Sequence, residues 1–193
     1  MRWKTARWSA ALVLLCVSSL ANTASTYRFT LDPGSSSVDA RVAFLGIGSR
    51  KAYFPALRGN VVLSPDQMTH IILDVSIDAT QLKADDTVTT GRLKGKDFFY
   101  VDKYPTVRFA GTQLAMADAT SGVVTGELTA RGVTRPVTLN VKFSAPPATA
   151  SGKEAIRLTG MTTINRREFG MTAYSVVVGK KVSITIRTRL LPD

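Results

Sequence analysis

The sequence predicts an all-β fold, an eight-stranded antiparallel β-barrel with a short helical insertion between two of its strands. From Tyr27 onward almost every segment alternates apolar and polar residues, the spacing of a strand with one buried face. Helical periodicity is nearly absent, and short turns separate most of the alternating runs. Because eight such strands in an open sheet would expose edges, they should form a closed barrel or a sandwich, and we favour the barrel.

The N-terminal segment has the pattern of a secretory signal peptide. Three basic residues precede an apolar run over 9–20, which is shorter than the roughly 20 residues of a spanning helix, and small residues follow it. We expect cleavage after Ala21 or, as the second choice, after Ala24. Residues 1–21 would then be the signal and 22–193 a single exported domain. An uncleaved anchor is the less favoured alternative.

Removing this segment limits the chemistry of the mature chain. The only cysteine, Cys16, leaves with the signal, so neither a disulfide nor a thiolate nucleophile is expected. The sequence has 25 Lys and Arg against 14 Asp and Glu, and loss of three basic residues with the signal leaves a charge of +8. This excess suggests transient contact with an anionic membrane surface. Nucleic acid is not an expected partner, because the basic residues are dispersed.

Eight alternating runs are the predicted strands, and each places one apolar set on a single face. The sets are Val38, Ala40, Val42 and Phe44; Leu57, Gly59, Val61 and Leu63; Ile71, Leu73, Val75 and Ile77; Val107, Phe109 and Gly111; Val124, Gly126, Leu128 and Ala130; Val137, Leu139, Val141 and Phe143; Ile156, Leu158, Gly160, Thr162 and Ile164; and Val182, Ile184, Ile186, Thr188 and Leu190. Residues 131–134 predict the hairpin turn between the fifth and sixth runs.

The segment 79–105 interrupts this pattern and is too long for a hairpin loop. Asp85 and Asp86 begin a stretch that predicts a short helix, although Gly91 and Gly95 weaken it. Long insertions on a rigid barrel are often lids or binding loops. We therefore expect this segment to contribute to a binding site.

Small residues recur on the predicted inner faces. They are Ala40, Gly59, Gly111, Gly126, Ala130 and Gly160. An eight-stranded barrel is near the size at which side chains either fill the interior or leave room for one ligand, so small residues favour an apolar cavity. Kinks that let the strands coil and close are an equally good explanation.

Catalytic motifs are not evident. His70 is the only histidine and has no cysteine or second histidine with which to hold a metal. A Gly-x-Ser-x-Gly elbow is missing, and a helix N-terminus explains Asp85 and Asp86 better than a catalytic carboxylate pair. We expect neither an enzyme nor a metal site.

Ordered motifs along the domain resemble the YceI-like family. They are Asp32-Pro33, Asp97-Phe98-Phe99, Lys103-Tyr104-Pro105, Gly126-Glu127-Leu128-Thr129, the stretch 132–137, Ile164-Asn165-Arg166 and Phe169-Gly170-Met171. The resemblance implies a lipocalin-like, mostly periplasmic barrel that holds a polyisoprenoid chain or isoprenoid quinone in an apolar tunnel. It implies a lining that includes Val42, Phe44, Leu73, Val75, Ile77, Leu93, Phe98, Phe99, Phe109, Leu128, Leu139, Val141, Phe169 and Met171. No cofactor other than such a lipid is implied.

The chain departs from that family where a ligand headgroup would lie. Members usually carry histidines at positions that are here Ser35, Phe44 and Arg92. Arg92, Lys94 and Arg166 are instead the candidate contacts for a phosphate or carboxylate headgroup. The alternative for Arg92 and Lys94 is that they belong to a run of solvated charges on a loop and contact no ligand. A structural clasp at one barrel end is the preferred interpretation of Arg166.

The combined prediction is a periplasmic, non-enzymatic binding protein for a long apolar lipid, used in transport, storage or stress protection. The alternative is an envelope interaction module with a filled barrel. Cavity size discriminates between them. We expect a monomer or a homodimer.

Overall fold

The computed structural model describes residues 25–193, and the expected signal peptide 1–21 lies outside this range. The strands are β1 (Tyr27–Leu31), β2 (Ser37–Phe44), β3 (Gly48–Phe54), β4 (Leu57–Leu63), β5 (His70–Asp78), β6 (Lys83–Ala84), β7 (Thr106–Met116), β8 (Ser121–Ala130), β9 (Val133–Phe143), β10 (Ile156–Asn165) and β11 (Val178–Pro192). One α-helix, α1 (Thr87–Lys94), and 3-10 turns at Pro33–Ser35, Pro65–Gln67, Ala79–Gln81, Pro147–Thr149 and Arg166–Phe169 complete the described residues.

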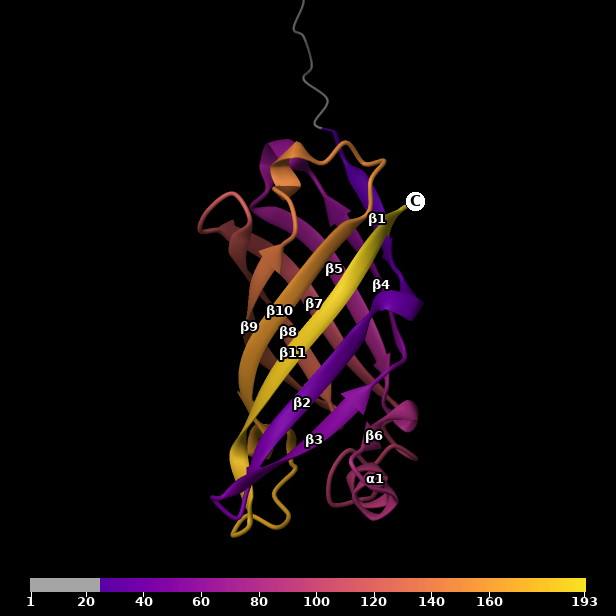
Figure 1. Ribbon diagram of the computed structural model, residues 1–193, viewed down its shortest axis with the longest axis vertical. Helices are drawn as coiled ribbons and strands as arrows, with labels where there is room; N and C mark the ends of the chain where they lie inside the picture. Colours follow the sequence, from indigo (N-terminus) through magenta and orange to yellow (C-terminus); the bar gives the residue numbers. More distant parts are fainter. Residues whose placement is uncertain (1–24) are drawn as a thin grey trace, which may run out of the picture.

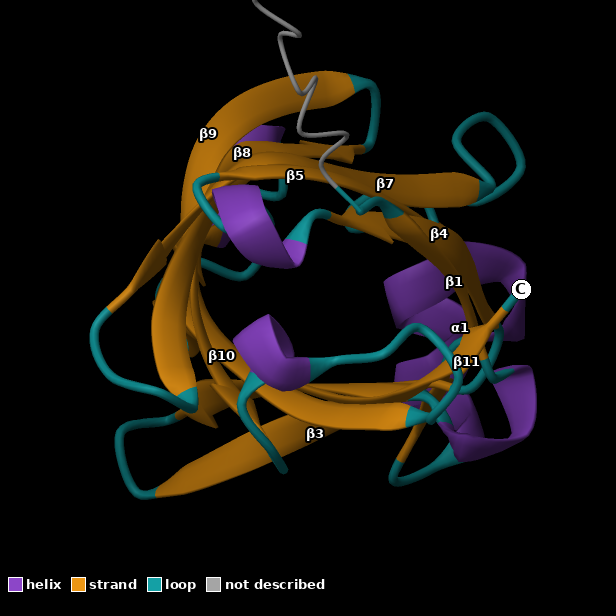
Figure 2. Ribbon diagram, turned by 90° about the horizontal axis from the view of Figure 1, so that it is seen from above, coloured by secondary structure: helices purple, strands orange, loops and turns teal. Residues whose placement is uncertain are grey.

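The strands close into a barrel. Antiparallel pairing runs in the order β1, β4, β5, β7, β8, β9, β10 and β11, and β11 then pairs with β1, Leu191 lying opposite Thr30. β2 follows β1 along the same edge of β11 and pairs with β3. Figure 1 shows the resulting cylinder from the side and Figure 2 shows it end-on. The predicted eight-stranded antiparallel barrel is confirmed.

Each of the eight predicted runs forms a strand. The structure adds three strands that were not predicted, β1, β3 and β6. β1 is only five residues long, and β6 is only two. In β3 the inward positions are Arg50, Ala52 and Phe54, and the charged Arg50 interrupts the apolar alternation that marks the other strands. Short length and a charged inward residue therefore explain why these elements carry no clear sequence pattern.

The insertion between β5 and β7 forms the predicted short helix at one end of the barrel (Figure 1). Asp86 starts α1: its carboxylate accepts hydrogen bonds from the backbone N–H and the hydroxyl of Thr89, each at 2.7 Å. These bonds to Thr89 lower the pKa of Asp86. The interpretation of the Asp85-Asp86 pair as a helix start is confirmed for Asp86. No helix among residues 25–193 is long and apolar enough to span a bilayer.

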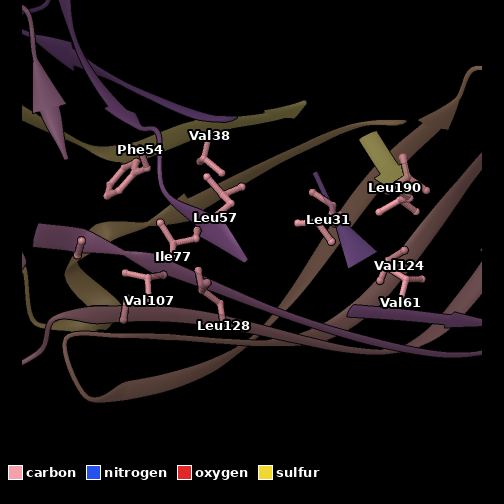
Figure 3. Close-up of a cluster of buried hydrophobic side chains, with 14 of the residues drawn as sticks. Leu31, Val38, Phe54, Leu57, Val61, Ile77, Val107, Val124, Leu128 and Leu190 are labelled. Carbon is pink, nitrogen blue, oxygen red and sulfur yellow. The ribbon is translucent and has the colours of Figure 1, made fainter. Parts of the chain in front are cut away.

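The predicted inner faces do point inward. In Figure 3, Val38, Leu57, Ile77 and Leu128 project from four different strands into the same interior. The register of β7 against β8 shifts between Gly111 and Gln113, and this bulge turns Leu114 inward in place of residue 113. Leu114 is therefore buried, although the predicted apolar alternation of this strand ends at Gly111.

Close strand contacts explain two of the small inner residues, Gly126 and Gly59. A Cβ atom on Gly126 would lie 2.3 Å from the carbonyl oxygen of Ala110 and 2.7 Å from Cα of Gly111, both in β7. A Cβ on Gly59 would lie 2.5 Å from the carbonyl oxygen of Asp74. These glycines let neighbouring strands approach, which supports the strand-coiling explanation of their spacing at these two positions.

Ion pairs on the outer wall contribute little to stability. Arg108 of β7 donates two hydrogen bonds of 2.7 Å to Asp74 of β5, which lowers the pKa of Asp74. Arg187 and Asp39 join β11 and β2 at 2.7 Å. Because both pairs are exposed to solvent, each should contribute about 1 kcal/mol or less. The barrel is held together mainly by its apolar interior.

Candidate functional site

The barrel encloses an apolar cavity of about 380 Å³. Its wall is built from the inner faces of all the barrel strands, together with α1 and the loop that follows it. The volume falls within the range of roughly 300–1,000 Å³ typical of small-molecule sites. A filled barrel, the basis of the alternative prediction, does not fit this geometry.

Most of the residues predicted to contact a ligand lie on the cavity wall. Those that do are Val42, Phe44, Leu73, Val75, Ile77, Leu93, Phe98, Phe99, Phe109, Leu128, Leu139, Val141 and Met171. Phe169 does not: it is 1% exposed and lines a separate shallow pocket with Tyr104 and Arg131. The 3-10 turn Arg166–Phe169 turns Arg166 toward the cavity and places Phe169 in the other pocket. That the wall residues contact a lipid stays a prediction.

An aromatic group closes the wall beside β3 and α1. Phe99 packs edge-on against Phe54 with ring centroids 5.4 Å apart, and Phe98 stacks on Tyr174 at 5.9 Å. Phe98 and Phe99 follow α1, whereas Tyr174 belongs to the loop before β11. The insertion therefore supplies part of the cavity wall, as expected for a long loop on a rigid barrel.

The charged residues on the cavity wall are all cationic. They are Arg41, Arg50, Lys51, Arg92 and Arg166. Arg50 lies over the ring of Phe44, 4.8 Å from its centroid, and Arg92 lies 6.0 Å from the centroid of Tyr174. Because none of the described residues on this wall is Asp or Glu, an anionic group would meet cations and no carboxylate there.

The candidate headgroup residues separate into two groups. Arg92 reaches the wall because it shares a helix face with Thr89 and Leu93, three and one positions away. Lys94 lies off that face and is not among the residues that line the cavity. Arg50 was not predicted, because a charged residue at an inward position leaves β3 without a clear apolar alternation.

Arg166 is a buried clasp. It is 3% exposed, and its guanidinium donates to the backbone carbonyls of Gly179 and Val178, both at 2.9 Å, and to that of Met171. Burial, with the charge of Arg167, lowers the pKa of Arg166. These bonds fasten the start of β11 and the loop before it to the end of β10. The preferred interpretation of Arg166 as a structural clasp is confirmed.

Metal chemistry has no visible site in this part of the chain. His70 is exposed at the start of β5. Within residues 25–193, His, Cys, Asp and Glu side chains do not gather in groups of three or more that could hold an ion.

Comparisons with known proteins agree with this architecture. Residues 29–190 match the YceI-like domain. A UPF0312 protein of Pseudomonas putida (strain GB-1) is 26% identical over 148 residues, which cover 77% of each chain. The crystal structure of Burkholderia cenocepacia BcnA is similar with a TM-score of 0.73 and 22% identity, over 82% of this chain and 98% of BcnA. A polyisoprenoid binding domain from Saccharophagus degradans, implicated in plant cell wall breakdown, has a TM-score of 0.64 and 14% identity, over 86% and 98%.

Proposed function

The chain belongs to the YceI-like domain family, and we propose that it binds a long apolar lipid, of the polyisoprenoid or isoprenoid-quinone type, inside its barrel. One observation carries the proposal: a cavity of about 380 Å³ whose wall is almost wholly aliphatic and aromatic. Such a wall offers contact to a hydrocarbon body and very few partners to a polar one. The Saccharophagus degradans domain, described as polyisoprenoid binding, supports this class of ligand.

The proposed role is that of a carrier or store, without catalysis. Among residues 25–193, those on the cavity wall are cations, threonines and apolar or aromatic groups, without a base or nucleophile that has a positioned partner. Together with the signal pattern in residues 1–21, this favours an exported protein that keeps an insoluble lipid in aqueous solution.

Native mass spectrometry of protein from the periplasmic fraction of its own host tests this proposal. We expect a mature chain beginning at Asn22 or Ser25 that carries one additional mass, which organic extraction releases and fragmentation identifies as an isoprenoid lipid. Protein that carries no lipid under these conditions would contradict the binding function. A chain from this fraction that retains residues 1–21 would contradict only the cleavage of the signal, whereas absence of the protein from the periplasmic fraction would contradict its export.

We further propose that the cations on the wall select the ligand head. Arg50 and Arg92 come from β3 and α1, and both lie against aromatic rings on the cavity wall. Arg166 already donates to three carbonyls, so it contributes mainly positive potential. Phosphate and quinone heads both present acceptor oxygens, but an ionised phosphate gains more from two guanidinium groups.

Replacing both Arg50 and Arg92 by glutamine should therefore reduce the preference for a polyprenyl phosphate over the corresponding polyprenol roughly tenfold, the loss expected for a charged hydrogen bond. Competition against a fluorescent polyprenol measures this preference, with an isoprenoid quinone as a third competitor. Arg135→Gln, which removes an exposed cation on β9, is the matched control. An unchanged preference in the double variant would mean that the head lies elsewhere.

A further inference from the structure

Exposed apolar side chains gather at the end of the barrel where β2 turns into β3. We call the turn 45–47 and the loop 172–177 together the tip. Ile47 is 94% exposed, Val176 97% and Leu45 55%, and Tyr174 is also exposed. Isolated exposed apolar residues are common, but a group of them on adjoining loops usually marks an interaction surface.

The two parts of the tip form one surface. The backbone N–H of Leu45 donates to the carbonyl of Val177 at 2.8 Å, and Phe44 pairs with Val178 where β2 meets β11. Figure 1 shows this turn and this loop side by side at the lower end of the barrel. The Arg166 clasp holds the same loop through Met171 and Val178.

The tip is also part of the cavity rim. Phe44, Tyr174, Val177 and Val178 contact the cavity, whereas Leu45, Ile47 and Val176 do not. The exposed apolar side chains therefore lie directly beyond the wall residues, on the outside of the same two loops. A surface that the tip contacts would face this part of the cavity.

The backbone conformation of the turn 45–47 indicates that its exposed leucine does not stabilise the turn. Leu45 and Gly46, the first two residues of the three-residue turn 45–47, have φ angles of 53° and 72°. A residue other than glycine rarely has a positive φ, and asparagine tolerates it better than leucine, because a bulky side chain is strained there. The tip thus keeps a strained, exposed leucine where asparagine would fit the backbone better.

The charge around the tip indicates what it contacts. Five exposed cations lie in the flanking segments 41–51 and 171–181, and neither segment contains Asp or Glu. They are Arg41, Arg50, Lys51, Lys180 and Lys181. Apolar side chains at the end of a loop, surrounded by cations, match the interface of a bilayer with anionic headgroups. A protein partner would have to be both apolar and acidic.

We propose that the tip docks on an anionic lipid bilayer, with Leu45, Ile47 and Val176 entering the headgroup region and the surrounding cations contacting lipid phosphates. Docking would bring the cavity rim to the membrane, where lipid enters or leaves. This step rests on the proposed lipid-binding function, but Leu45, Ile47, Val176, Lys180 and Lys181 do not line the cavity, so docking can be tested separately from loading through these five residues.

Vesicle co-sedimentation tests the docking step. Wild-type protein should bind vesicles of phosphatidylcholine mixed with phosphatidylglycerol and bind phosphatidylcholine alone much more weakly. The double variant Ile47→Asn/Val176→Asn should bind the mixed vesicles at least about tenfold more weakly, since two apolar side chains no longer enter the interface. Lys180→Gln/Lys181→Gln should lose about as much, and only on anionic vesicles.

Two further variants separate docking from folding. Ile72→Asn removes an exposed apolar side chain on β5, away from the tip, and should leave vesicle binding unchanged. Leu45→Asn relieves the positive-φ strain, so it should weaken vesicle binding while the melting temperature stays the same or rises. Tip variants that bind mixed vesicles as well as wild type would overturn the proposal.

Loading assays keep the two proposals apart. Tip variants should take up a fluorescent polyprenol from dilute aqueous solution as wild type does, but take it up from vesicles more slowly. Wild-type protein that loads from solution yet ignores anionic vesicles would overturn docking and leave lipid binding intact. Protein that docks but never loads would overturn lipid binding alone.

Discussion

Replacing Ala40 by phenylalanine should abolish most lipid binding while the barrel still folds. Ala40 lies on β2 facing the cavity, and its cross-strand partners are Ala52 and Ile184. A phenyl ring there would project into the cavity of about 380 Å³ rather than into backbone. Each methylene of ligand that it excludes from the cavity costs about 0.8 kcal/mol of burial. Exclusion of only two or three methylenes weakens binding roughly tenfold or more.

Titration with a fluorescent polyprenol measures this loss, and circular dichroism with thermal unfolding checks the fold. Ala115→Phe makes the same substitution at an exposed position on β7 and should bind as wild type does. If Ala40→Phe retained full affinity, the lipid would have to bind outside the barrel interior. A loss of affinity in both variants would point to a general effect of the added ring.

Replacing Arg166 by methionine should lower the free energy of unfolding by about 3 kcal/mol or more. The variant leaves the carbonyls of Met171, Val178 and Gly179 without their guanidinium donor, and each unsatisfied buried acceptor costs roughly 1–3 kcal/mol. Methionine fills similar apolar space but donates no hydrogen bond. The loop before β11 should also exchange its amide hydrogens faster, because the clasp no longer fastens it.

Urea denaturation and hydrogen exchange measure these effects. Arg167→Met removes the neighbouring cation, which is exposed, and should change stability far less. Arg166→Lys should recover only part of the loss, because one ammonium group cannot reproduce the planar array of donors that reaches three carbonyls. A fully stable Arg166→Met variant would mean that the carbonyls find other donors and that the clasp is dispensable.

Local sequence patterns predict most of the strands and the side of each strand that faces inward. The alternation at Val38, Ala40, Val42 and Phe44 predicts both a strand and its inner face, and all four side chains do contact the cavity. At Leu114 the alternation is broken by a bulge, which depends on the pairing of β7 with β8 and is not visible in either strand alone.

Local sequence patterns do not predict which of the candidate site residues reach the cavity. Arg92 and Lys94 are two residues apart on α1 and chemically alike, yet only Arg92 reaches the cavity. Which helix face meets the barrel is decided by packing of the whole insertion. The same is true of Phe169, whose burial was foreseen as part of the cavity wall but occurs in a different pocket.

Alternation along the chain is enough to predict the strands, their inner faces and the apolar character of the interior, because side chains of a strand alternate through covalent geometry alone. Three other features depend on the folded arrangement: β1 meets β11 to close the barrel, Arg166 donates to three carbonyls, and the turn 45–47 joins the loop 172–177. Each of these depends on backbone segments that meet across the fold, and no local pattern of residues encodes such a meeting.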